Sequence, residues 1–121
     1  MNDFDYSDEF LEHIAEVFKA FAHLTRLQIL RELHREMAAG GDGVSVQELQ
    51  EAVGTSQANI SKHLNFMADQ GLVEARKEGT SRKYVIASED VMMICDYVCG
   101  YMEKRFDNLG SLPNSTSTED Q

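Results

Sequence analysis

The polar side chains between residues 56 and 63 are of the types that read nucleic acid. Gln and Asn amides can pair with adenine edges, whereas Lys and Ser reach guanine edges or phosphate oxygens. Apolar Ile60, Leu64 and Met67 recur at helical spacing, which predicts one helix with a buried stripe. We expect its first turns to enter a major groove, although a plain solvated helix face is the alternative. The side chains expected on that face are Ser56, Gln57, Asn59, Ser61, Lys62 and His63.

A second group of candidate DNA-binding residues follows in a predicted β-hairpin. Residues 72–77 and 82–86 are predicted as strands around a four-residue loop, 78–81, that contains Gly79. Cations in such a wing can contact the phosphate backbone or enter the minor groove, where the potential is negative. Charged residues also protect edge strands from aggregation, and both roles can hold together. The cations of this hairpin are Arg76, Lys77, Arg82 and Lys83.

The charge distribution separates this region from the rest of the chain. The 121 residues have a net charge of −10, which is unfavourable for contact with phosphates. Residues 56–84 nevertheless hold five Lys or Arg against three Asp or Glu, a local charge of +2, while the other residues sum to −12. A basic segment in an acidic chain favours a localised DNA contact.

Helical patterns precede this region. Apolar residues predict one helix from Phe10 to Phe21 and a second from Leu27 to Met37, whose inward positions include Leu27, Leu30 and Leu33. Glycines in 38–43 end the second helix, and Ser45 with Glu48 forms a capping-box pattern that starts a short third helix. A short helix, a Gly-containing turn and a longer helix form a helix-turn-helix. The sequence therefore predicts a mainly α winged helix-turn-helix with a small β-hairpin (α+β), in the order α-α-α-α-β-β-α.

The last predicted helix, which begins after Ser88 and ends near residue 106 or 108, is apolar on two sides. Such a helix is buried on both sides, and a chain of this size offers only one core. We therefore expect its second side to contact another subunit in a two-fold dimer. The two apolar stripes comprise Val91, Ile94, Val98 and Met102, and Met92, Cys95, Cys99 and Phe106.

Length and composition predict one domain, which we place at residues 10–108. Residues 1–9 form an acidic lead, and the polar residues 109–121 are expected to be a disordered tail. The longest purely apolar run, Val91 to Cys95, is too short to cross a membrane, and the acidic start is unlike a signal peptide. We expect a reduced cytoplasmic protein without membrane contact.

The order of these elements and several local motifs resemble the ArsR/SmtB family of bacterial and archaeal repressors. The resemblance covers about residues 10–106, and Leu-Thr-Arg-Leu at 24–27 together with Ser-Lys-His-Leu at 61–64 is its most specific part. It implies a homodimer through the first and last helices, and a two-fold symmetric double-stranded DNA operator that is released by an inducer. The motif-bearing ranges are 18–30, 46–49, 56–64, 71–74 and 79–84. The DNA-reading positions implied are Gln57, Ala58, Asn59, Ser61, Lys62 and His63.

The family's metal sites are not matched. Ser45 and Gln47 stand where one class carries a Cys-x-Cys pair, and no His follows His63 to serve a last-helix site, so we assign no metal ligands. Cys95 and Cys99 lie four residues apart and share a helical face. Buried packing is one interpretation of this pair. The other is a thiol sensor for a soft metal, a metalloid or a thiol-reactive inducer.

The remaining polar residues suggest no chemistry. His13, His23 and His34 lack ligand spacing, and Arg26 either holds helix ends together or meets phosphate. No spacing indicates a catalytic set, so we predict that the protein is not an enzyme. Two rivals to an inducer-released repressor stay open: a winged-helix protein-interaction module that does not bind DNA, and a repressor without a small-molecule inducer.

Overall fold

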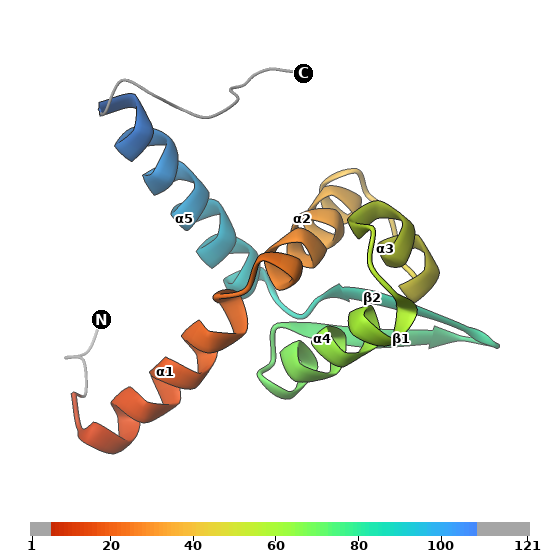
Figure 1. Cartoon of the computed structure of the whole chain (residues 1–121), viewed down its shortest axis with the longest axis horizontal. Helices are drawn as coiled ribbons and strands as arrows, with labels where there is room; N and C mark the ends of the chain where they lie inside the picture. Colours follow the sequence, from red (N-terminus) through yellow and green to blue (C-terminus); the bar gives the residue numbers. More distant parts are fainter. Residues whose placement is uncertain (1–5, 109–121) are drawn as a thin grey trace. The chain divides into compact units, whose positions relative to one another are not determined.

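The computed structural model describes residues 6–108 and divides them into two compact units, which meet between Ser88 and Glu89. The predicted tail, 109–121, lies outside the described residues. The first unit contains α1 (Asp8–Phe21), α2 (Leu24–Ala38), α3 (Val46–Val53), α4 (Gln57–Asp69), β1 (Val73–Glu78) and β2 (Ser81–Ile86). The second contains α5 (Glu89–Asn108). This order confirms the predicted winged helix-turn-helix, with α3 and α4 beside each other and β1 against α4 (Figure 1).

The core of the first unit lies between α2, α3, α4 and the hairpin. Its fully buried side chains include Ile29, Leu33, Leu49, Ile60 and Leu64. Burial of each such side chain contributes about 1.5–3 kcal/mol, so these contacts fix how α3 and α4 pack. Helix α4 is thus held by its apolar side, and its polar side lies opposite the core.

The inward face of α2 differs from the predicted one. Leu27, expected inside, is 48% exposed, whereas Ile29 is fully buried and Arg26 is half-buried. Positions 26, 29, 30, 33 and 37 make one continuous helical stripe, and the predicted stripe started one residue too late. The apolar type of Leu27 was misleading because Arg26 occupies the inner position with hydrogen bonds instead.

Local capping explains where the helices begin. The Ser45 side chain accepts a hydrogen bond from the Glu48 amide at 3.1 Å, and the Glu48 carboxylate accepts one from the Ser45 amide at 2.9 Å, which confirms the capping box. Gly54 ends α3 in the left-handed conformation, with φ of 84°. Ser7 caps α1, which begins at Asp8, slightly before the predicted apolar pattern.

The hairpin is tighter than predicted. Glu78 pairs with Ser81, so the connecting loop is Gly79–Thr80 rather than residues 78–81, and Gly79 adopts the positive φ of 63° that such a turn requires. At its base, Val44 bridges to Tyr84 on the free edge of β2 through hydrogen bonds of 3.0 and 2.8 Å. Gly43 permits this approach, because a Cβ there would lie 2.9 Å from the Cβ of Lys83.

Two helices bury little of their own surface. In α1 the only buried residue is Ala20, and in α5 the only one is Val91. Exposed apolar side chains on these helices include Phe10, Leu11 and Phe18 in α1, and Met93, Ile94, Tyr97, Val98 and Tyr101 in α5. Across residues 6–108, no helix combines the length and the apolar character needed to span a bilayer.

Candidate nucleic-acid interface

The N-terminal turns of α4 present the amide and cation expected of a DNA-reading helix. Gln57, Ala58 and Lys62 are exposed, and Ser61 is half-buried. Ser56 is the N-cap, and its Oγ accepts a hydrogen bond from the Asn59 amide at 3.1 Å. The unpaired amides of a helix N-terminus also favour anions such as phosphate. Gln57 and Lys62 are therefore the two long side chains of this face that are free to reach a duplex.

Asn59 is more restrained than its type suggested. Its side-chain Nδ2 donates a hydrogen bond to the Thr55 hydroxyl at 3.1 Å, and the residue is half-buried. That bond orients the side-chain carbonyl oxygen, which remains an acceptor. The side chain of Asn59 is thus preorganised by the turn between α3 and α4.

The structure does not place His63 on the DNA-reading face. Its side chain is only 4% exposed, and Nδ1 lies 3.2 Å from Nη1 of Arg26. The expected exposure is wrong because residue 63 belongs to the same buried stripe as Ile60, Leu64 and Met67. The sequence pattern gave no sign of a polar partner across the core, since Arg26 is 37 positions away.

The four wing cations fall into two pairs with different surroundings. Lys77 and Arg82 are register partners on one face of the hairpin, both exposed, and no described residue forms an ion pair with them. Arg76 lies 3.8 Å from a Glu74 carboxylate oxygen. Lys83 donates a 3.0 Å hydrogen bond to Asp42. The free pair is therefore better placed for DNA than the pair with intramolecular partners.

The Lys83–Asp42 contact perturbs both groups. The hydrogen bond with Lys83 and its positive charge lower the pKa of Asp42, and the same contact raises the pKa of Lys83. Both shifts favour the charged forms, so the contact is an ion pair between an ammonium and a carboxylate. Lys83 thus ties the base of the wing to the loop before α3, a role that its predicted DNA contact did not include.

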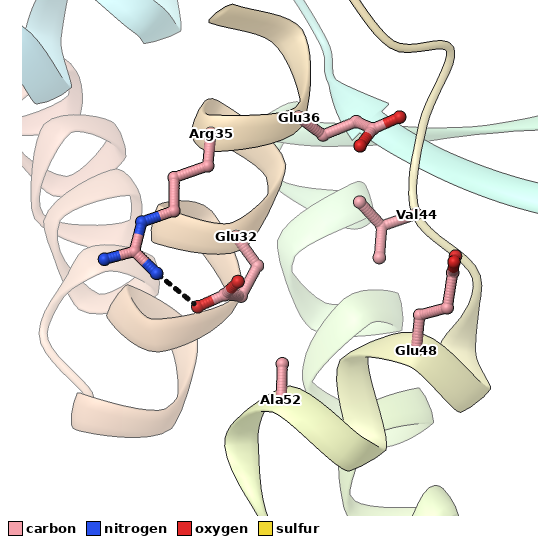
Figure 2. Close-up of a pocket in the computed structure, with 6 residues that line it drawn as sticks. All are labelled: Glu32, Arg35, Glu36, Val44, Glu48 and Ala52. Carbon is pink, nitrogen blue, oxygen red and sulfur yellow. Dashed lines mark hydrogen bonds and ion pairs between the residues drawn. The ribbon is translucent and has the colours of Figure 1, made fainter. Parts of the chain in front are cut away.

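A pocket of about 280 Å³ lies between α2 and α3 in the first unit. Figure 2 shows three carboxylates around it, those of Glu32, Glu36 and Glu48, with Arg35 bound to Glu32 at 3.4 Å. Carboxylates repel phosphate, so this pocket is no part of a DNA interface. Val44 and Ala52 complete its lining.

The two thiols lie on α5, where Cys95 is half-buried and Cys99 is exposed. Burial raises the pKa of the Cys95 thiol, and nearby Cys99 and Asp96 raise it further. A protonated thiol is a weaker nucleophile and metal ligand than a thiolate. Within residues 6–108, no three His, Cys, Asp or Glu side chains are grouped to hold a metal ion.

Comparison with known proteins adds independent information. A family model for a helix-turn-helix domain matches residues 21–76. An HTH-type transcriptional regulator of Methanocaldococcus jannaschii is 39% identical over 87 residues, covering 72% of this chain and 92% of that protein. A Halobacterium salinarum protein, named for repression of an arsenical resistance operon, is 39% identical over 69 residues, covering 57% of this chain and 55% of that protein.

A similar solved structure comes from Mycobacterium bovis. It is a homodimeric winged helix-turn-helix DNA-binding domain, described as a possible ArsR-family transcriptional regulator. The two chains are 33% identical with a TM-score of 0.75, over 88% of this chain and 94% of that one.

Proposed function

This chain belongs to the ArsR/SmtB family of winged helix-turn-helix transcriptional regulators, and from that membership we propose that it represses transcription as a DNA-bound homodimer. The observation that carries the proposal is the exposed polar face at the start of α4, where Gln57 and Lys62 have no partner among the described residues. We place its action in the cytoplasm, because a repressor must reach the DNA that it binds.

In this proposal α4 reads the major groove and the hairpin contacts the backbone or minor groove. Gln57 supplies an amide that can pair with adenine, and Lys62 neutralises a phosphate. Lys77 and Arg82 supply the two wing cations that have no ion pair within residues 6–108. Ser56, Ala58, Asn59 and Ser61 complete the face, with Arg76 and Lys83 as weaker contributors.

The proposed dimer forms through α1 and α5. Each helix exposes several large apolar side chains and buries a single residue, which is unfavourable for an isolated chain in water. A two-fold interface would cover these faces and give the operator its two-fold symmetry. Two recognition helices in such a dimer contact half-sites about one helical turn apart.

The test is fluorescence anisotropy with duplex DNA from the region upstream of the protein's own gene, against a scrambled duplex of equal length. We expect specific binding to exceed non-specific binding by about 10³-fold or more. Gln57→Ala should reduce that ratio by the equivalent of about 1–3 kcal/mol, whereas Gln28→Ala on α2 should leave it unchanged. Equal affinity for both duplexes would favour the protein-interaction alternative.

Release by an inducer is the second part of the proposal, with Cys95 and Cys99 as its candidate site. A soft metal or metalloid must displace the thiol proton of Cys95, and burial makes this displacement harder because it raises the pKa of that thiol further. Arsenite or Hg²⁺ should release DNA from the wild type and not from the Cys95→Ser, Cys99→Ser variant. Equal release from both proteins would remove the thiols from the proposal.

A further inference from the structure

One arginine joins three helices of the first unit. Arg26, in the first turn of α2, donates from Nε to the Ala20 carbonyl oxygen at 2.9 Å and from Nη2 to the Lys19 carbonyl oxygen at 2.8 Å. Its Nη1 lies 3.2 Å from Nδ1 of His63 in α4. The last carbonyls of a helix lack intrahelical donors and carry partial negative charge, so a guanidinium is favourable at the end of α1.

The contact with His63 has only one consistent protonation state. A guanidinium has five donors and no acceptor, and it does not lose its proton in proteins. Nδ1 of His63 must therefore accept, which leaves the ring neutral with its proton on Nε2. The neighbouring His23 is held by a backbone contact, because its Nδ1 accepts a hydrogen bond from the Thr25 amide at 3.1 Å.

Further contacts hold Arg26 against α4. The guanidinium carbon lies 4.5 Å from the centre of the Phe66 ring, a cation–π contact one turn after His63. The His23 ring lies 4.5 Å from the His63 ring. The Arg26 cluster, defined as His23, Arg26, His63 and Phe66, thus connects the end of α1 and the start of α2 to the buried side of α4.

We propose that Arg26 is a positioning residue for DNA binding, which fixes the orientation of α4 against the end of α1 through neutral His63. The inference rests on the proposed function, in which α4 reads DNA and α1 belongs to the dimer interface. The Arg26 cluster then transmits the geometry of the dimer to the recognition helix, and so sets how accurately two helices fit two half-sites. Arg26 itself does not touch DNA.

The surroundings of His63 make this connection sensitive to acid. The titratable and charged groups that act on the ring are His23 before α2, Arg26 in α2 and Lys62 in α4, while the ammonium of Lys19 in α1 pairs with Glu16. Burial lowers the pKa of His63 most, and His23, Arg26 and Lys62 lower it further. Protonation would remove the acceptor for Nη1 and place a second cation beside the guanidinium.

The direction of the pH effect follows from linkage. An unfolded histidine takes up its proton near pH 6.5, whereas folded His63 resists protonation to lower pH. Folding is therefore weakened as the pH falls below about 6.5, and DNA binding weakens with it once the folded ring protonates. Protonation of the many carboxylates would act oppositely, because a less negative protein is attracted more strongly to DNA.

The experiment measures DNA affinity by anisotropy from pH 7.5 to pH 5.5, at constant ionic strength, for the full-length wild type and variants. His63→Asn keeps an acceptor near the Nδ1 position and cannot titrate, and His34→Asn on α2 is the matched control. We expect the wild type and His34→Asn to lose about fivefold in affinity on acidification. His63→Asn should bind as the wild type does at pH 7.5 and lose nothing at pH 5.5.

A second variant tests Arg26 directly. Arg26→Lys keeps the charge but cannot bond two carbonyls and His63 together, so we expect about tenfold weaker DNA binding at pH 7.5 with the dimer intact by sedimentation. If a folded Arg26→Lys protein binds DNA with wild-type affinity, the inference is overturned and the proposed function is not. An unchanged acid response in His63→Asn does the same even if Arg26→Lys fails to fold. A wild type that binds no DNA overturns the proposed function and this inference together.

Discussion

Helices α4 and α5 both carry apolar side chains, but they differ in how much of that apolar surface is buried within one chain. In α4 the residues Ile60, Leu64 and Met67 are fully buried within one chain, and the opposite face is polar. In α5 only Val91 is buried, and large apolar side chains such as Tyr97 and Val98 are 78% and 51% exposed. A helix whose apolar side is covered can offer its polar side to DNA, whereas a helix with uncovered apolar sides needs a second protein surface.

The largest expected effect is on the free energy of unfolding, after a substitution on the buried side of α4. Leu64→Ala removes a fully buried side chain and should lower the free energy of unfolding by about 2–5 kcal/mol. Urea denaturation followed by circular dichroism measures it, and the loss should persist at every protein concentration. A loss below about 1 kcal/mol would contradict the burial of this position.

The corresponding change in α5 should act on association. Val98→Asp places a carboxylate on the apolar face, and a two-fold interface contains the change twice. The dissociation constant of the dimer should therefore rise by about 100-fold or more. Sedimentation velocity measures the shift, while Glu103→Gln on the same helix serves as control. An unchanged dimer would show that this face of α5 is not the subunit contact.

The start of α4 provides a smaller test. Ser56→Ala removes the N-cap acceptor for the Asn59 amide and should cost about 1 kcal/mol of stability, whereas Ser56→Asn should retain most of it. Thermal or urea unfolding of the three proteins measures the difference. If Ala and Asn destabilise equally, the cap is not the source of the effect.

The smallest expected effect is on the salt dependence of DNA affinity, which should differ between Lys62 and Lys83. Lys62→Ala should lower the slope of log affinity against log salt by about 1, because one phosphate contact is lost. Lys83→Ala should change the slope much less, since its ammonium is bound to Asp42. Affinity titrations at four salt concentrations measure both slopes. Similar decreases would mean that Lys83 leaves Asp42 when DNA binds.

The sequence predicted the elements well where local chemistry decides them. Ser45, Ser56 and Gly54 begin or end helices through contacts within a few residues, and such signals are readable in a linear pattern. The Gly79-containing loop between two predicted strands located the hairpin, although the predicted loop was too long because pairing continues to Glu78 and Ser81. Element order followed directly from these signals.

Features that depend on long-range contacts were not predicted. The partnership of Arg26 with His63, and of Asp42 with Lys83, joins residues 37 and 41 positions apart. Residue type suggested that Lys83 and His63 meet DNA, but type alone does not reveal a competing partner. Of the two roles left open for Arg26, the structure shows the contact with a helix end, through the carbonyl oxygens of Lys19 and Ala20. Its partner His63 was not predicted.

The bridge between Val44 and Tyr84 has a consequence for how this protein could be rearranged. Because the chain leaves Val44 and returns beside it after about 40 residues, the intervening α3, α4, β1 and β2 form a module whose two ends adjoin. Segments with adjoining ends are those that tolerate transplantation between hosts. Exchange of this segment between two such proteins should therefore preserve the fold when the α2 face that it packs against, including Arg26, is exchanged with it.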